Sequence, residues 1–274
     1  MTETTSSLAQ HAADLDEAVT SRRAIAQLSR SASLTLDDAY RVQALGSELR
    51  AARGDRLVGV KLGFTSKAKA LQMGVSDVIF GRLHASGEYA DGGGVAMEDF
   101  IHPRVEPEVA FRLGAEFDAR AAADPEAELR AAVDAVAPGL EIIDSRYADF
   151  KFSLTDVVAD NTSAVGFVTG AWQPVDLTAT DVRYDDRPVT LEIDGAAAAT
   201  GSTSDILGDP VLALPAIARM AAAQGVVLPA GSVLLAGAAT AAVALPGGVT
   251  VRATVPGLGS VSVTTTGAAT EEQR

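Results

Sequence analysis

The sequence predicts an α+β fold, in which a helical N-terminal segment precedes a β-rich part with a few helices. Apolar residues recur at helical spacing over residues 8–54. After residue 80, short alternating runs are separated by glycine and proline turns. We therefore expect a helical segment over residues 1–75, a β-rich domain over residues 76–267 and a disordered tail over residues 268–274.

The N-terminal elements follow from capping and periodicity. The stretch TLDDAYRVQALGSELRAARG predicts a helix that ends at Gly54, with Thr35 as the N-cap and two aspartates in the first turn. The run RLVGVKLGF then has the composition of a short strand. TSKAKALQMGV predicts a short helix capped by Thr65 or Ser66.

The later elements are mostly strands. IHPRVEPEVAFRL and GLEIIDSRY each predict one strand, and GVTVRATVPGLGSVSVTTTG predicts two strands around a Pro-Gly turn. DVRYDDRPVTLEIDGAAAATGSTS predicts a hairpin with Asp185 and Asp186 at the turn. ILGDPVLALPAIARMAAAQG returns to helical spacing, and four of its apolar residues share one face: Leu207, Val211, Leu214 and Ala218.

Composition excludes several classes of protein. The 274-residue chain has a net charge of -14 and a sequence pI of about 4.6, so a nucleic-acid-binding surface is not expected. It has no cysteine and three histidines, which argues against disulfides and against zinc or copper sites. The N-terminus lacks the pattern of a signal peptide, and the apolar run GSVLLAGAATAAVALPGG is too interrupted to span a membrane. We expect a cytoplasmic protein.

Two glutamates alternate with apolar residues in the first predicted strand of the β-rich part. Side chains at positions i and i+2 of a strand point to one face, so Glu106 and Glu108 point to one place. Like charges held that close raise a pKa unless a cation lies between them. Glu141 supplies a third carboxylate, and three carboxylates suit a hard divalent cation such as Mg²⁺. The solvated face of an edge strand has the same spacing, so the pattern alone leaves both interpretations open.

Lys61 lies in an apolar run between two glycines, Gly59 and Gly63. Such a lysine either extends its ammonium to solvent or keeps it inside the protein, where its charge can act on other groups. The glycines permit close approach of a ligand to the backbone. A buried lysine next to a bound cation is expected to have a lowered pKa.

A further polar cluster lies in DSRYADFKFSLTDVVADNTSA. A surface loop with local Asx turns explains this composition as well as a site does. His84 and His102 are either acid–base groups or, more commonly, hydrogen-bonded structural residues. The run GAATAAVALPGG either offers backbone N–H groups to an anion or simply turns. The charged and polar members of the cluster are Asp144, Arg146, Lys151, Asp156, Asp160, Asn161 and Ser163.

Taken together, these segments resemble the 2-keto-4-pentenoate hydratase / 4-oxalocrotonate decarboxylase family of the fumarylacetoacetate hydrolase superfamily. The resemblance spans about residues 30–265 and rests on five segments in order: VKLGFTSKAKALQMGV, IHPRVEPEVAF, LEIIDSRYADFKFSLTDVVADN, ILGDPVLAL and GLGSVSV. It implies a β-rich fumarylacetoacetate-hydrolase-like fold with an N-terminal helical extension. It also implies Mg²⁺ or Mn²⁺ bound by Glu106, Glu108 and Glu141, and Lys61 in the pocket.

Within that family, the segments HPR and FKF of this chain resemble decarboxylases more than hydratases. The implied reaction is metal-dependent decarboxylation of 4-oxalocrotonate (2-oxo-3-hexenedioate) to 2-hydroxypenta-2,4-dienoate and CO₂. This is a lyase step in aromatic hydrocarbon catabolism by meta-cleavage. One alternative is hydration of 2-hydroxypenta-2,4-dienoate at the same metal site. A non-enzymatic alternative is a scaffold subunit for a partner hydratase.

The residue roles follow from this reaction. Lys61 is the candidate for binding or protonating the intermediate, with Asp160 and Ser163 orienting the substrate. Arg146 or Arg104 pairs with the carboxylate that leaves, and Ser66 contributes to substrate binding. The expected partners are a small 2-oxo acid, further copies of the chain and a family hydratase, with no nucleic acid and no membrane.

Overall fold

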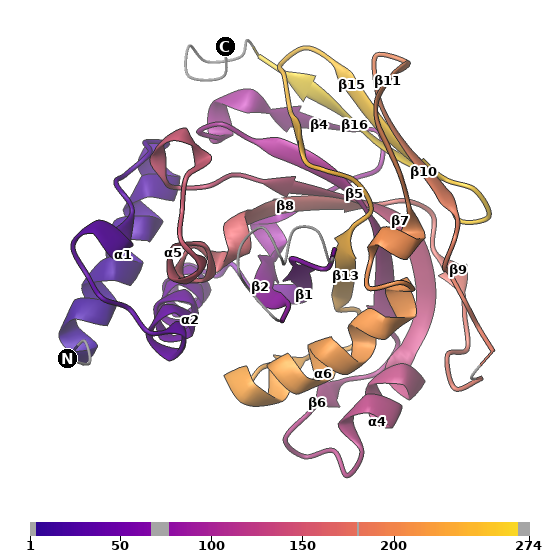
Figure 1. Ribbon diagram of the computed structural model, residues 1–274, viewed down its shortest axis with the longest axis horizontal. Helices are drawn as coiled ribbons and strands as arrows, with labels where there is room; N and C mark the ends of the chain where they lie inside the picture. The colour runs from indigo at the N-terminus through magenta and orange to yellow at the C-terminus, as the bar shows by residue number, and fades with distance from the viewer. Residues whose placement is uncertain (1–3, 67–76, 180, 268–274) are drawn as a thin grey trace.

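The structure is a computed structural model that describes residues 4–66, 77–179 and 181–267. The predicted α+β class is confirmed, because a large sheet and a smaller second sheet are flanked by helices (Figure 1). The helices are α1 (Thr5–Ser21), α2 (Leu36–Ala52), α4 (Pro125–Ala132), α5 (Leu154–Ala159) and α6 (Ala213–Gln224). Short 3-10 segments are η1 (Leu28–Arg30), η2 (Ala85–Gly87), η3 (Met97–Asp99), η4 (Ala148–Phe150), η5 (Asn161–Ser163), η6 (Thr203–Asp205) and η7 (Pro210–Leu212).

The large sheet has nine strands, and its main path runs β2-β1-β13-β5-β7-β8-β3. These strands are β2 (Ile79–His84), β1 (Leu57–Gly63), β13 (Val233–Ala238), β5 (Arg104–Leu113), β7 (Val133–Ile143), β8 (Ala164–Thr169) and β3 (Glu88–Tyr89). Two short strands extend it, β14 (Val243–Ala244) on β5 and β9 (Gln173–Pro174) on β7. The second sheet has the order β11 (Ala196–Ser202), β10 (Pro188–Ile193), β15 (Thr250–Val255), β16 (Gly259–Thr266) and β4 (Gly93–Ala96). A separate pair joins β12 (Val227–Leu228) to β6 (Phe117–Asp118).

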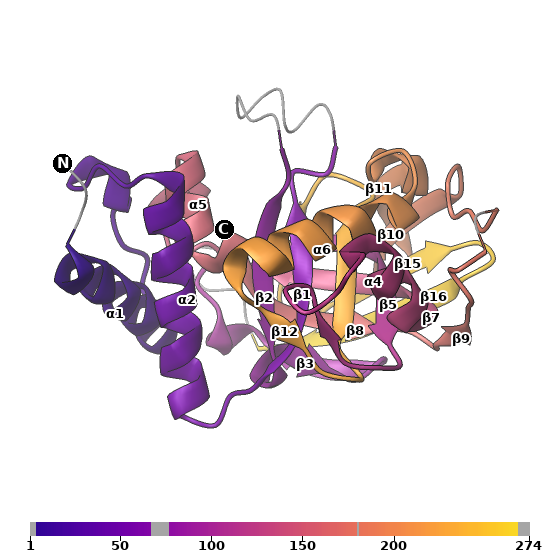
Figure 2. The ribbon, with the colours of Figure 1, turned by 90° about the horizontal axis from the view of Figure 1, so that it is seen from below.

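The N-terminal helices form as predicted and pack at one side of the sheets, next to α5 (Figures 1 and 2). Thr35 caps α2 in a capping box with Asp38, which confirms the predicted helix start. The strand that follows, β1, pairs in parallel with β13 and antiparallel with β2. The helical part therefore ends at Ala52, and β1 belongs to the large sheet. The division at residue 75 remains a prediction.

The hairpin predicted around residues 181–204 forms, but its predicted turn is wrong. Asp185 and Asp186 form a turn before β10, whereas the loop between β10 and β11 is Asp194-Gly195. Both loop residues have positive φ, 49° and 79°, as a tight two-residue hairpin turn requires. The Asp-Gly pair is the stronger hairpin signal in the sequence, and it outweighs the Asp-Asp pair.

Two layers of core hold the sheets and helices together. Apolar side chains of β5 and β7, such as Val105 and Leu140, face the second sheet and pack against Val251 and Val263. On the opposite face, α6 packs across β1 and β13 (Figure 2). Three of the four residues predicted to share a face of this helix are buried, and Leu207 is half-buried in the loop before it.

Within the described residues, Thr203–Gln224 is the one helical stretch with the length and hydropathy of a membrane span. Over half of it, 56%, is buried inside the fold, as expected for a core helix. The apolar run at 231–248 forms β13 and β14 instead of a helix. The helix predicted at TSKAKALQMGV lies mostly outside the described residues, as does the tail 268–274.

Candidate metal site and adjoining pocket

Glu106, Glu108 and Glu141 converge between two inner strands of the large sheet. In the antiparallel register of β5 and β7, Glu106 is opposite Glu141, and Glu108 is opposite Gly139. Directly opposed side chains on one face lie within contact distance of each other. One carboxylate oxygen from each glutamate lies within 4.8 Å of the other two. All three side chains are buried, which argues against a solvated edge strand.

Two carboxylate oxygens of this triad have no donor among the described residues. Oε1 of Glu108 and Oε1 of Glu141 are inaccessible to solvent and accept no hydrogen bond. Buried charged acceptors are costly unless a donor or a cation compensates them. Buried carboxylate oxygens that face one point match the hard oxygen ligands of a divalent cation such as Mg²⁺. The donor set therefore fits a metal ion of this kind.

Burial also perturbs the protonation of these groups. Desolvation raises the pKa of Glu141 to about 7, although the attraction of Lys61 opposes the shift. Desolvation raises the pKa of Glu108 well above its ordinary value, and repulsion by Glu141 adds to the effect. The carboxylates alone therefore compete for protons, and a bound cation would relieve that repulsion.

Lys61 extends from β1 into the same space. Its Nζ lies 2.9 Å from Oε2 of Glu141, and the lysine side chain is only 4% exposed. Burial by itself would lower the pKa of Lys61, but the carboxylates of Glu141, Glu106 and Glu108 outweigh it and raise the pKa. The lowered pKa expected for Lys61 beside a bound cation remains a prediction. Of the two interpretations of Lys61, the structure favours the internal one.

Gly237 fixes the orientation of Glu108. Its backbone N–H donates a hydrogen bond of 2.8 Å to Oε2 of Glu108. The residue has a φ of +124°, and a Cβ at this position would collide with the side chain of Thr65. The Gly-Ala run thus offers a backbone N–H group to an anion, as one interpretation of the sequence expected, and the anion is the carboxylate of Glu108.

A cavity of about 350 Å³ adjoins the triad. This volume suits a small organic ligand. Three aromatic residues line it, Phe64, Phe150 and Phe152. Its polar and charged lining consists of Lys61, Thr65, Arg104, Glu106, Thr162 and Ser163.

The structure brings four of the predicted residues to this cavity, Lys61, Glu106, Arg104 and Ser163. The Oγ of Ser163 is buried and has no hydrogen-bond partner among the described residues, so it could bind a ligand in the cavity. Ser66 is half-buried and follows Thr65, but the cavity lining does not include it.

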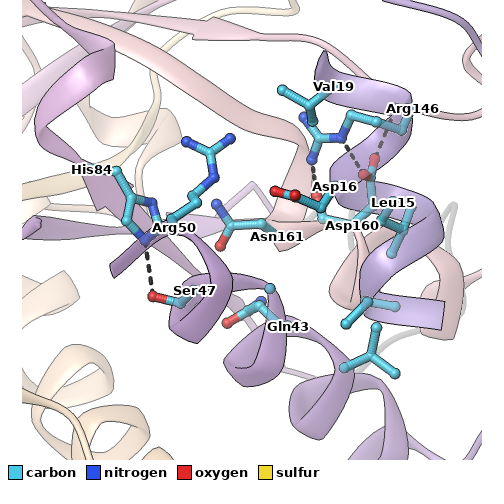
Figure 3. A pocket seen from close by; sticks show the side chains of 14 residues that line it. Leu15, Asp16, Val19, Gln43, Ser47, Arg50, His84, Arg146, Asp160 and Asn161 are labelled. Atoms are coloured by element: carbon cyan, nitrogen blue, oxygen red, sulfur yellow. Dashed lines mark hydrogen bonds and ion pairs between the residues drawn. The ribbon is translucent and has the colours of Figure 1, made fainter. Parts of the chain in front are cut away.

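Arg146 and Asp160 lie elsewhere. They form a buried ion pair beneath α1 and α2, where they line a separate cavity of about 40 Å³ (Figure 3). Arg146 Nη1 also donates to the backbone carbonyl of Asp144, at 2.6 Å. Burial raises the pKa of Asp160 to about 6, against the opposing effect of Arg146. This pair ties η5 to the strand end of β7 and does not reach the larger cavity.

The two histidines are hydrogen-bonded, as structural histidines usually are. His84 Nε2 lies 2.8 Å from the hydroxyl of Ser47 on α2 (Figure 3). His102 Nε2 donates to the backbone carbonyl of Ser145 at 2.7 Å. Both belong to the packing around the cavities, and neither lines the larger one.

Two residues of the cavity wall, Phe64 and Thr162, were not among the predicted site residues. Phe64 and Thr162 have positive φ angles of 59° and 56°, which are uncommon for residues other than glycine. Such conformations cluster at functional sites. No local sequence signal marks them, because phenylalanine and threonine are not left-handed residues by preference.

Comparisons with known proteins agree with this geometry. No protein-family model matches the sequence. A 4-oxalocrotonate decarboxylase from Pseudomonas sp is 49% identical over 253 residues, which are 92% of this chain and 96% of that protein. A 2-keto-4-pentenoate hydratase from Burkholderia vietnamiensis is 37% identical over 263 residues, which are 95% of this chain and 98% of that protein.

Solved structures agree as well. The 4-oxalocrotonate decarboxylase from Pseudomonas putida G7, complexed with magnesium and adipate, has a TM-score of 0.87 at 34% identity and covers 96% of this chain and 99% of that chain. A fumarylacetoacetate hydrolase family protein from Yersinia pestis has a TM-score of 0.55 at 16% identity, over 75% of this chain and 91% of that chain, and shares the fold alone. The predicted fumarylacetoacetate-hydrolase-like fold is thus confirmed. With identities of 37–49% over more than nine-tenths of its length, this chain belongs to the family of 4-oxalocrotonate decarboxylases and 2-keto-4-pentenoate hydratases.

Proposed function

We propose that this protein decarboxylates 4-oxalocrotonate to 2-hydroxypenta-2,4-dienoate and CO₂ with the help of Mg²⁺ or Mn²⁺. The buried glutamate triad beside a small-molecule cavity carries this proposal, because Oε1 of Glu108 and Oε1 of Glu141 have no donor among the described residues. The names of the similar decarboxylases support it, and so does the complex of one of them with magnesium and adipate. Adipate is a six-carbon dicarboxylate, as is 4-oxalocrotonate.

Glu106, Glu108 and Glu141 would hold the metal. When bound there, a divalent ion supplies Lewis acidity toward the carbonyl of a 2-oxo acid. Gly237 keeps the Glu108 carboxylate in its orientation, and Lys61 keeps Glu141 paired. The triad is thus preorganised before substrate arrives.

Lys61 and Ser163 are the groups proposed to act on substrate. Loss of CO₂ from C6 leaves an electron pair that moves through the conjugated chain to the ketone oxygen at C2. The ammonium of Lys61 lies in the cavity wall and would stabilise this developing charge and give the oxygen a proton, which yields the 2-hydroxy dienoate. The unpaired hydroxyl of Ser163 would hold the substrate in position. We assign Arg146 and Asp160 a structural role instead, because their ion pair lies away from the cavity.

Hydration of 2-hydroxypenta-2,4-dienoate is the second candidate, because hydratases are similar over nearly the whole chain. To separate the two, purified protein with Mg²⁺ is supplied with 2-oxo-3-hexenedioate or with 2-hydroxypentadienoate. CO₂ release from the first supports decarboxylation. Consumption of the second alone would make the protein a hydratase.

A mutation distinguishes an enzyme from a scaffold subunit. In the double variant Glu106→Gln, Glu108→Gln an enzyme loses turnover and keeps its fold, whereas a scaffold for a hydratase still raises the activity of its partner. We also propose that the protein assembles with further copies of itself or with a family hydratase, and that it is located in the cytoplasm.

A further inference from the structure

Arg104 places a cationic side chain at the wall of the larger cavity. Among the residues that the structure describes, no carboxylate forms an ion pair with Arg104, and its side chain is exposed. Its guanidinium carbon lies 4.5 Å from the ring centroid of Phe150, which is a cation–π contact. The aromatic ring thus limits where the guanidinium can point without neutralising its charge.

Phe150 is itself fixed in place. Phe150 and the preceding Asp149 both have positive φ, 56° and 59°, a backbone conformation that persists only where the surroundings enforce it. The ring of Phe150 packs on His102, with centroids 5.1 Å apart. His102 is anchored in turn, because its ring donates to the carbonyl of Ser145.

The carboxylate of Asp144 fastens the start of β5 to the same segment. It accepts backbone N–H groups from Ile101 at 2.7 Å and from His102 at 2.8 Å. Arg104 follows two residues later and begins β5. The strand end that carries Arg104 and the segment that carries Phe150 therefore form one fixed unit.

The position of Arg104 on β5 matches the length of the substrate. Arg104 and Glu106 are two residues apart on one strand and line the same cavity, whereas Val105 between them faces the second sheet. Two residues of strand span about 6.6 Å. In a six-carbon 2-oxo enedioate, the ketone carbon and the far carboxylate carbon are about 5 Å apart, given bonds of about 1.5 Å.

We propose that Arg104, positioned by the ring of Phe150, forms a subsite for the second carboxylate of the substrate and so selects dicarboxylic 2-oxo acids over monocarboxylic ones. This inference rests on the proposed function, because it places the 2-oxo acid end of the ligand at the glutamate triad. Arg104 is the binding residue and Phe150 is a positioning residue that acts through it.

The test compares two ligands that differ only in the far carboxylate. 2-Oxoadipate and 2-oxohexanoate share a six-carbon chain and a 2-oxo acid end. Their dissociation constants are measured by calorimetry on the full chain saturated with Mg²⁺. A charge-assisted contact predicts that the wild type binds 2-oxoadipate about ten- to hundredfold more tightly than 2-oxohexanoate.

Four variants dissect this preference. Arg104→Met removes the charge and should lower the preference to near one, with the affinity for 2-oxohexanoate unchanged. Phe150→Leu removes the π face and should lower the preference about two- to fivefold. Phe150→Tyr keeps an aromatic ring and should keep the wild-type preference for 2-oxoadipate. Arg112→Met is the matched control, because Arg112 also lies on β5 over an aromatic ring, Trp172, but is paired with Asp134 outside the cavity.

Several outcomes overturn the subsite. A preference that persists in Arg104→Met excludes Arg104 as the selector. An equal loss for both ligands in Phe150→Leu makes Phe150 a packing residue only. A wild type with no preference, or one that binds neither ligand, also refutes the proposal. Failure of the proposed function looks different: the wild type would prefer 2-oxoadipate and yet release no CO₂ from 2-oxo-3-hexenedioate.

Discussion

Lys61 Nζ lies 2.9 Å from Oε2 of Glu141, and this ion pair is buried at the centre of the large sheet. Removal of one partner of a buried pair typically costs about 3–5 kcal/mol, because the other charge is left uncompensated. The pair therefore links the stability of the sheet to the chemistry of the cavity.

Lys61→Met should separate these two contributions. We expect a loss of about 3 kcal/mol in the free energy of unfolding without metal, and Mg²⁺ should restore more stability in the variant than in the wild type. CO₂ release should fall by about a hundredfold or more, because the proton donor is missing. Urea unfolding with and without Mg²⁺, together with turnover, measures both. Unchanged unfolding and turnover within a few-fold of the wild type would contradict the role of Lys61.

Gly237→Ala tests the support of Glu108. The new Cβ would collide with Thr65 and displace the N–H that Glu108 accepts, at a φ of +124° that disfavours alanine. We expect a loss of about 1–3 kcal/mol in stability together with weaker Mg²⁺ binding. Gly195→Ala is the control, since Gly195 also has positive φ but a Cβ added there would meet no atom within 4 Å. Equal Mg²⁺ affinity in both variants would show that Gly237 does not orient the triad.

Asp160→Asn tests the structural role of the second buried ion pair. The loss of its charge should destabilise the protein by about 3–5 kcal/mol and leave the KM of the folded enzyme unchanged. The exposed pair of Arg22 and Asp99 is the control, because Asp99→Asn should cost about 1 kcal/mol or less. Denaturant unfolding and Michaelis kinetics decide the matter. A large increase in KM with full stability would return Asp160 to the substrate site.

The pH dependence of stability should report on His84. Burial, and then repulsion by Arg50, lowers the pKa of His84 from 6.5 to about 4, although Asp55 opposes the shift and Arg82 adds to it. The unfolded chain binds this proton below pH 6.5 and the folded chain does not until about pH 4, so stability is lost as the pH falls between these values. The loss reaches about 3 kcal/mol.

His84→Gln isolates that effect, because the titration of Asp160 and of the other acids is shared by both proteins. The free energy of unfolding of the wild type, relative to that of the variant, should decrease as the pH is lowered from 7 to 4.5. Parallel curves for the two proteins would show that His84 is not held neutral by its surroundings.

The elements with a periodic or capping signal could be predicted from the sequence. Thr35 at the start of α2 and the Pro-Gly turn between β15 and β16 lie where predicted, because local chemistry determines them. The triad also has a local signal, the alternation of Glu106 and Glu108. Glu141 could be named as a third carboxylate from the next predicted strand. Its pairing with Glu106 could not be predicted in this way, because strand register is a long-range property.

The features that could not be predicted depend on tertiary structure and have no local signal. Arg146 and Asp160 lie in a polar, aromatic-rich segment that contributes to the larger cavity and to the smaller one, and composition does not tell which side chain faces which. The left-handed backbone at Phe64 and Thr162 is enforced by tertiary packing, so no propensity predicts it. The N–H of Gly237 reaches Glu108 only because β13 pairs with β5.

The most direct test of the account is the dependence of CO₂ release on added Mg²⁺. The protein is first stripped with a chelator and then supplied with 2-oxo-3-hexenedioate while Mg²⁺ is titrated. The account predicts that release is absent in the stripped protein, returns with saturation in the wild type, and does not return in the double variant Glu106→Gln, Glu108→Gln. Full turnover in exhaustively chelated buffer, or equal recovery in the double variant, would contradict it.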